Sequence, residues 1–435
     1  MLTFLKRLRN SSLFSSSAVY LLSNILAAAI PFMLLPVLTR YLSPAEYGEV
    51  AMFLTLISGL AAFTGMSVHG AAGRKFYDDD LAEHGLKDFI GSCLQILLAS
   101  SLAVLAITWL FQDQLSEWLG LQPRWILWAV IASAASFAFQ LRMGQWQVRK
   151  QASKYGITQV AQALLNILLS ILLVVVFLQG SDGRISAYII SSIIFAFIAV
   201  FLLHRDNLLA FGWHPNHIKE ALSFGAPLIP HIAGMFLLGA VDRLVINEQL
   251  GLAQVGIYMV AVQLASVMGI IFDAINNAYV PWLFERLVRD QADEKKQIVR
   301  LTYAYFSISL LIAGLAFLVG PYVVTLIAGE RYAQAGTVIG WLALGQAFSG
   351  MYLMVTNYIF YSKRTGLLSL VTISSGLLNV IFLVVLIRLL GLTGAAMAFA
   401  ISMALRFLLT WWVAHKRHPM PWFHDPIISV AANRT

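Results

Sequence analysis

Long apolar runs recur along this sequence, and they constrain its fold more than any other feature. A helix needs roughly 20 mostly apolar residues to cross about 30 Å of hydrocarbon. Runs of about this length lie near residues 17–38, 48–70, 89–111, 124–143, 157–178, 185–203, 221–241, 256–280, 300–320, 336–360, 367–387 and 394–414. They are continuous rather than alternating, which favours helices over a membrane β-barrel. The sequence therefore predicts an all-α polytopic membrane protein with twelve transmembrane helices.

Composition supports this class. The chain is 59% hydrophobic and 11% charged, whereas soluble domains are about 45–50% apolar and about 25% charged. Of the 29 Lys and Arg residues, 22 fall in the alternate segments that include both termini. Because such a bias marks the cytoplasmic side, we expect both termini to be cytoplasmic. The net charge of +8 then needs no nucleic-acid partner to explain it.

Several short segments recur in the second part of the chain. TRYLSPAEYGEV at 39–50 resembles NEQLGLAQVGIY at 247–258, about 208 residues later. In the same way, RKQAS at 149–153 corresponds to SKRTG at 362–366. An offset of 213 pairs Gln159, Gln162 and Asn166 with Thr372, Ser375 and Asn379. Six spans precede the join and six follow it, so the sequence predicts two pseudo-repeated six-helix halves in parallel around a central cavity.

The repeat divides the chain into four predicted segments. An N-terminal six-helix half covers 1–203, and a C-terminal half covers 221–414. Between them, 204–220 is predicted to be a cytoplasmic interfacial linker, because its aromatic residues suit the depth of lipid headgroups. Residues 415–435 form a predicted cytoplasmic tail.

Three stretches carry a family resemblance: LPVLTRYLSPAEYGEVAMF (35–53), VDRLVINEQLGLAQVGIYMVAVQLA (241–265) and NNAYVPWLFERL (276–287). The chain resembles the Wzx-type oligosaccharide flippases of bacterial polysaccharide and O-antigen biosynthesis. These belong to a superfamily that also contains multidrug antiporters and lipid II flippases. The resemblance extends over essentially the whole chain in length, span count and motif order.

This resemblance implies a function in the bacterial inner membrane. The substrate would be an undecaprenyl-diphosphate-linked oligosaccharide, moved from the cytoplasmic to the outer leaflet by alternating access. Membrane lipids, a polysaccharide polymerase and a chain-length regulator are the implied partners. No cofactor or metal is expected, and coupling to the membrane potential, H⁺ or Na⁺ stays open.

The sequence disfavours two alternatives within the superfamily and one class of enzyme. The resemblance gives drug antiporters a cation-binding acid in the first span, where this chain offers only Asn24, and it gives lipid II flippases two further spans. A polymerase or ligase would need a sizeable outer loop, but the longest predicted one has about 15 residues (321–335). The absence of a Gly-Lys dipeptide excludes a Walker A loop in this chain. A non-enzymatic transporter is therefore predicted.

Polar side chains within the predicted spans or at their ends are the candidates for the substrate path, because charge is costly in hydrocarbon. They are Arg74, His69, His231, Asp242, Arg243, Asp273, Asn277, Gln346, Asn357 and Arg406. His231 and Asp242 differ by about 20° in helical azimuth at 100° per residue, and Gln346 and Asn357 share a predicted face. Arg40 and Glu46, in the first of the paired turns, are predicted to form an outer gate.

Structural interpretations compete with these roles. Asp242 and Arg243 would also serve as an ion pair that closes the seventh span, and Arg74 as a positive-inside anchor. Arg406 is close enough to its helix end to snorkel. The polar stripe that begins at Gln159 suits either a substrate path or hydrogen bonding between helices. Asp273 is the preferred cation site if transport is coupled to an ion gradient.

Overall fold

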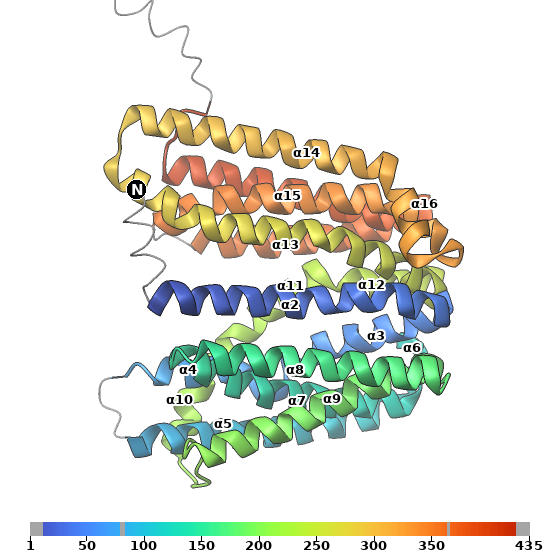
Figure 1. The fold of residues 1–435 in the computed structure, drawn as a ribbon, viewed down its shortest axis with the longest axis vertical. Coiled ribbons are helices and arrows are strands. Elements are labelled where there is room, and N and C mark those ends of the chain that lie inside the picture. The colour runs from blue at the N-terminus through green and yellow to red at the C-terminus, as the bar shows by residue number, and fades with distance from the viewer. Residues whose placement is uncertain (1–11, 79–82, 363–365, 423–435) are drawn as a thin grey trace, which may run out of the picture. The chain divides into compact units, whose positions relative to one another are not determined.

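The computed structural model describes residues 12–78, 83–362 and 366–422, and within these ranges it contains helices and no strand (Figure 1). The helices of the first part are α2 Ser12–Tyr41, α3 Pro44–Leu60, α4 His69–Lys75, α5 Glu83–Leu110, α6 Gln112–Leu119, α7 Pro123–Val148, α8 Ala152–Ser170 and α9 Gly180–Arg205. Those of the second part are α10 Pro215–Gly225, α11 Ile229–Gly239, α12 Val241–Leu250, α13 Leu252–Arg289, α14 Ala292–Ala328, α15 Gly336–Tyr361 and α16 Gly366–Arg417.

In the described ranges, nine helices are long and apolar enough to cross a membrane, or ten if the bent pair α3 and α4 forms one span. The twelve predicted runs map onto fewer continuous helices. The last two runs both lie in α16, whose 52 residues would extend about 78 Å if straight. Gly391 breaks this helix with φ 59° and ψ −138°, a conformation that favours glycine. In α2, the described apolar segment is the short helix Phe32–Tyr41.

The second predicted run, 48–70, is not one continuous helix. A single turn of 3₁₀-helix at Thr64–Ser67 separates α3 from α4, and the two helices differ in direction by 59°. Gly65 has a φ of 74°, and Met66 follows with 46°, which is uncommon for a residue with a side chain. The Gly65 N–H donates to Ser100 Oγ at 2.8 Å. Such a partner is needed because hydrocarbon cannot satisfy a freed backbone group.

The chain forms two compact units. Unit 1 comprises Met1–Val260 with Thr325–Gln334, and unit 2 comprises Ala261–Val324 with Ala335–Thr435. In unit 1, α7 packs against α3, α5 and α9, and its small residues, such as the fully buried Ala132, allow close approach of the helices. The predicted division into two repeated halves joined by 204–220 stays a prediction.

Within unit 1, the starts of α3 and α13 meet at a pair of glycines. A Cβ atom at Gly48 would overlap the carbonyl oxygen of Leu252, and one at Gly256 would overlap the carbonyl oxygen of Pro44. The contact is reciprocal, because Leu252 and Gly256 lie 208 residues after Pro44 and Gly48. This offset is the one predicted between the two turns, so the contact supports their pairing.

Unit 2 packs around an aromatic cluster that includes its C-terminal described residues. Phe306, Phe407 and Trp411 lie within 5.2–5.9 Å of one another, measured between ring centroids. Trp422 is only 5% exposed, and its carbonyl oxygen accepts a hydrogen bond from Tyr303 Oη at 2.7 Å. The segment that follows α16 is therefore held against α14.

His418 lies in this segment, outside the candidate spans, and its ring stacks on Tyr358 with an interplanar angle of 13°. Burial lowers the pKa of His418, and the nearby Lys295 lowers it further. Folding therefore disfavours the protonated imidazole, so stability is fully present above the ordinary value of about 6.5 and declines as pH falls below it. The unfolding temperature should fall less between pH 7.5 and pH 5.5 for His418→Gln than for the parent protein. Equal falls in the two proteins would contradict this.

Candidate functional site

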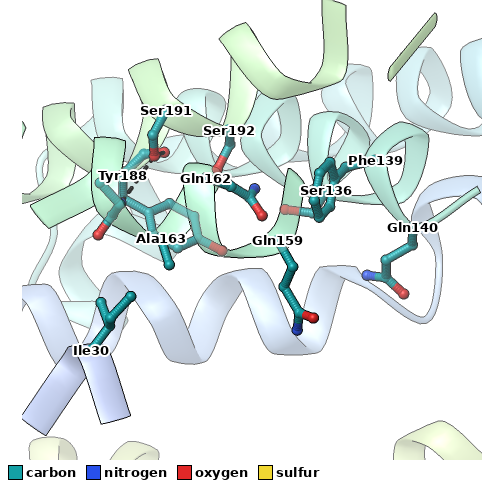
Figure 2. Close-up of a pocket in the computed structure, with 11 residues that line it drawn as sticks. Ile30, Ser136, Phe139, Gln140, Gln159, Gln162, Ala163, Tyr188, Ser191 and Ser192 are labelled. Carbon is teal, nitrogen blue, oxygen red and sulfur yellow. Dashed lines mark hydrogen bonds between the residues drawn. The ribbon is translucent and has the colours of Figure 1, made fainter. Parts of the chain in front are cut away.

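Helices α2, α7, α8 and α9 of unit 1 surround a cavity of about 330 Å³ (Figure 2). None of the eleven lining residues among those described carries a charge, and most are amides or hydroxyls. They are Ile30 of α2, Ser136, Phe139 and Gln140 of α7, Gln159, Gln162, Ala163 and Asn166 of α8, and Tyr188, Ser191 and Ser192 of α9. A polar, uncharged cavity among apolar helices is a candidate functional site, since polar groups at membrane depth are costly to maintain.

The α8 wall of the cavity follows from helical spacing. Gln159, Gln162 and Asn166 are three and four residues apart, so their side chains share one face of the helix. The carbonyl oxygen of the Gln159 amide is buried and has no hydrogen-bond partner among the described residues. A buried acceptor left unpaired costs free energy, and a hydroxyl of a bound ligand would satisfy it.

Asn166 is fixed at one end of this wall. Its Nδ2 donates to Ser191 Oγ at 2.9 Å, and its Oδ1 accepts from Arg184 Nη1 at 3.0 Å. The same guanidinium nitrogen donates to Ser170 Oγ at 3.1 Å. Arg184 does not line the cavity itself. It orients the amide of Asn166 and places a positive charge behind the polar wall.

The chemistry of the lining suits a neutral, hydroxyl-rich ligand. Amides and hydroxyls both donate and accept hydrogen bonds, as sugar hydroxyls do, and Phe139 and Tyr188 add flat apolar faces. A carboxylate or phosphate would instead favour arginine or lysine in direct contact. The cavity is therefore matched to a sugar unit rather than to a diphosphate.

The positions that the repeat pairs with this stripe have a different environment in unit 2. Thr372, Ser375 and Asn379 are 9%, 0% and 3% exposed. The Thr372 hydroxyl donates to its own helix, at the Leu368 carbonyl oxygen 3.0 Å away. The stripe in unit 1 lines an open cavity and also makes an interhelical hydrogen bond through Asn166, whereas these positions in unit 2 are closely packed.

Apart from the stripe that begins at Gln159, none of the residues predicted for the substrate path or the gate lines this cavity. His69 begins α4, half-buried, with its ring edge-on to Phe137 at 5.3 Å between centroids. Arg74 is exposed and lies over the Phe224 ring, beside a second cavity that also contains Lys75. His231 is exposed on α11.

The face predicted to be shared by His231 and Asp242 is not formed. The helix breaks at Ala240, where φ is −141°, so an azimuth counted through this residue is wrong. Asp242 is buried and accepts hydrogen bonds from Tyr258 Oη at 2.8 Å and from the Arg243 N–H at 2.9 Å. The Arg243 side chain lies 3.7 Å from this carboxylate and also donates to the Gly239 carbonyl oxygen. This geometry agrees with the structural interpretation of Asp242 and Arg243.

The two gate candidates differ in their surroundings. Glu46 forms a capping box with Ser43, whose backbone N–H donates to the Glu46 carboxylate at 2.8 Å while Ser43 Oγ accepts from the Glu46 N–H at 3.3 Å. Such a box stabilises the start of α3. Arg40 is exposed in the last turn of α2. Their role as a gate stays a prediction.

Five predicted residues lie in unit 2. Asn357 is buried and donates to Asn276 Oδ1 at 2.8 Å, an interhelical hydrogen bond between α15 and α13. Gln346 is half-buried on α15, and the Arg406 guanidinium lies 3.9 Å from the centroid of the Tyr352 ring. Asp273 and Asn277 are both exposed on α13.

The α9 wall and Arg184 were not among the predicted site residues. Tyr188, Ser191 and Ser192 recur at helical spacing, which is a signal that the sequence does contain. Serine and tyrosine are common in membrane helices without any functional role, so only the packing of α9 against α8 identifies this face.

Comparisons with known proteins identify the family and the fold of this chain. The chain matches the polysaccharide biosynthesis protein family over residues 13–287. It is 28% identical over 387 residues to an uncharacterized membrane protein of Haemophilus influenzae, covering 84% of this chain and 88% of that protein. It is 25% identical over 399 residues to the succinoglycan biosynthesis transport protein ExoT of Rhizobium meliloti, covering 88% of this chain and 73% of ExoT.

Among solved structures, the lipid II flippase MurJ in its inward closed conformation has the same fold. The TM-score is 0.72 at 14% sequence identity, and the alignment covers 92% of this chain and 87% of MurJ. The family match includes more than half of the sequence, from α2 almost to the end of α13. The chain therefore belongs to the polysaccharide biosynthesis protein family.

Proposed function

We propose that this protein is a flippase for an undecaprenyl-diphosphate-linked oligosaccharide. It moves the lipid-linked sugar from the cytoplasmic to the outer leaflet of a bacterial inner membrane, by alternating access and with both termini in the cytoplasm. Twelve spans in two repeated halves, with Gly391 between the last two, are part of this proposal.

The uncharged cavity of unit 1 carries the proposal. It offers amides, hydroxyls and two aromatic rings to a ligand, in a family named for polysaccharide biosynthesis. ExoT is named as a transport protein for succinoglycan biosynthesis, and MurJ, which shares the fold, is named as a lipid II flippase. A multidrug carrier would be expected to present a more apolar pocket to its substrates.

The direct test is translocation in reconstituted vesicles. The purified protein is incorporated with a fluorescent undecaprenyl-diphosphate oligosaccharide, and a membrane-impermeant reagent reports the fraction in the outer leaflet. Protein-dependent translocation of this lipid, and not of lipid II offered in parallel, is the expected result. Translocation of lipid II alone, or export of a cationic dye without any lipid movement, would overturn the proposal.

The unpaired amide oxygen in the cavity gives a specific prediction. Gln159→Leu removes an acceptor and two donors while nearly preserving side-chain size, so transport should decrease about tenfold, the effect of one or two lost hydrogen bonds. The matched control is Gln114→Leu on the exposed surface of α6, which should leave the transport rate unchanged. Equal rates for the two variants in the vesicle assay would exclude Gln159 from the substrate path.

The energy source is a further part of the proposal. Moving a diphosphate out of a negatively charged cell is favoured by about 2.3 kcal/mol per charge for each 100 mV. An inside-negative potential across the vesicles should therefore speed outward translocation and shift its final distribution. If neither changes, the potential does not drive transport. Loss of a pH-gradient dependence in Asp273→Asn would point to proton coupling instead.

The proposed partners follow from the substrate. A polymerase would join the exported units, and a chain-length regulator would limit the product. Deletion of the gene should cause the lipid-linked repeat unit to accumulate on the cytoplasmic side, and mass spectrometry of that lipid would identify the sugar.

A further inference from the structure

We propose that unit 2 carries a binding groove for one anionic phospholipid of the surrounding bilayer. A cavity of about 230 Å³ lies among α13, α14 and α15. Aromatic and aliphatic side chains dominate its lining, including Tyr279, Trp282, Tyr305 and Met354. This groove is separate from the sugar cavity proposed in unit 1 and does not depend on it.

The groove suits a hydrocarbon chain. Ile275 and Leu301 belong to its lining and are 42% and 46% exposed, so the groove is open at these two apolar side chains. The hydroxyl of Thr302 already donates to the Ile298 carbonyl oxygen at 2.9 Å. The lining has no amide comparable to those of the cavity in unit 1, and it offers little to a sugar.

One end of the groove carries a cation that forms no ion pair with any carboxylate among the described residues. Arg286 lies one turn after Trp282, and its guanidinium carbon is 4.0 Å from the centroid of the indole ring. The Nε of Arg286 is buried and has no hydrogen-bond partner among the described residues. Arg289, by contrast, donates to Glu294 at 3.2 Å. Of these two arginines, Arg286 is therefore the one whose guanidinium is available to an anion, and a phosphate is the group that its planar donors fit.

The apolar lining of the groove and the guanidinium of Arg286 follow one another along α13. At 1.5 Å per residue, Arg286 is about 6 Å beyond Trp282 and about 10 Å beyond Tyr279 along the helix. A molecule that uses both must have a phosphate at one end and a flexible apolar chain at the other. A phospholipid with a single phosphate matches one cation, whereas a diphosphate-linked oligosaccharide would leave most of its polar groups without partners here.

Native mass spectrometry of the full-length protein, with phosphatidylglycerol or phosphatidylcholine added to delipidated samples, tests this assignment. One molecule of phosphatidylglycerol should bind in preference to phosphatidylcholine. Arg286→Ala should weaken that binding about tenfold, the loss of a charge-assisted hydrogen bond, and Arg286→Lys should restore part of it. The control Arg289→Ala removes the same charge one turn later and should leave binding unchanged.

A second variant tests the apolar part. Ile275→Trp fills the groove and should abolish the preference for phosphatidylglycerol over phosphatidylcholine, while leaving Arg286 in place. Thermal unfolding is used to confirm that this variant is folded. Equal losses in Arg286→Ala and Arg289→Ala would overturn the groove in favour of diffuse surface charge. Equal retention of both phospholipids would also overturn it. Displacement of phosphatidylglycerol by equimolar undecaprenyl phosphate would assign the groove to the carrier lipid instead.

Discussion

Replacing Gly48 with alanine should destabilise the protein and impair transport, although alanine is normally the better residue in a helix. The new methyl group would overlap the carbonyl oxygen of Leu252, and backbone atoms cannot move aside as a side chain can. Overpacking of this kind costs about 1–3 kcal/mol, and it would push the starts of α3 and α13 apart. Thermal unfolding in detergent and translocation in vesicles measure the two effects.

Gly144→Ala is the matched control for this experiment. A Cβ atom at Gly144 in α7 would meet nothing within 4 Å, so the same exchange there should stabilise the protein by about 0.4–1 kcal/mol. Gly256→Ala should resemble Gly48→Ala, because it disrupts the same contact from the other helix. The double variant should lose less stability than the sum of the losses in the two single variants. Stabilisation by Gly48→Ala would show that the two helices are apart in the folded protein.

Asp206→Asn should cause the largest loss of stability among the single exchanges considered. Asp206 follows α9 and accepts a hydrogen bond from Arg142 of α7, whose side chain is 1% exposed and stacks on Trp146 at 4.3 Å. Removing the carboxylate leaves a buried cation without a counter-charge, which typically costs about 3–5 kcal/mol. The fraction of folded protein after solubilisation, followed by thermal unfolding, measures this loss.

Two comparisons separate charge pairing from other effects of the exchange. Asp182→Asn removes the partner of Arg124 at 2.5 Å, but these side chains are 38% and 53% exposed to solvent, so its effect should be below about 1 kcal/mol. The double variant Arg142→Met with Asp206→Leu removes both charges and should recover most of the stability. If Asp206→Asn is no worse than Asp182→Asn, the buried pair does not stabilise the fold.

The helices of this protein could be predicted from its apolar runs, but their interruptions could not. A single glycine such as Gly65 is common in membrane helices, and the sequence alone does not indicate which one allows a break. The freed backbone at Gly65 depends on Ser100, which lies 35 residues away. The break at Ala240 similarly changed the predicted neighbourhood of His231, because azimuths can be counted only along an unbroken helix.

The candidate site was predictable in part. The spacing of Gln159, Gln162 and Asn166 identifies one polar wall, while the opposite wall depends on how α9 packs. Arg142 stands at the end of the predicted run 124–143, and charged residues near span ends usually lie in water, so the sequence does not indicate that it is buried. Its burial becomes evident only when Asp206 and Trp146 are placed around it.

The contrast between the two polar stripes bears on how such a protein changes during evolution. Residues at Gln159 and Gln162 face open space and can be exchanged without disturbing a helix contact. The positions that the predicted repeat pairs with them, Thr372 and Ser375, are packed, so substitutions there are penalised through folding. Under the proposed function, relatives with different sugars should therefore diverge fastest along α8 and α9, while the positions that the predicted repeat pairs with them in α16 remain small and polar. Specificity would then vary in unit 1, while the corresponding positions of unit 2 preserve the packing.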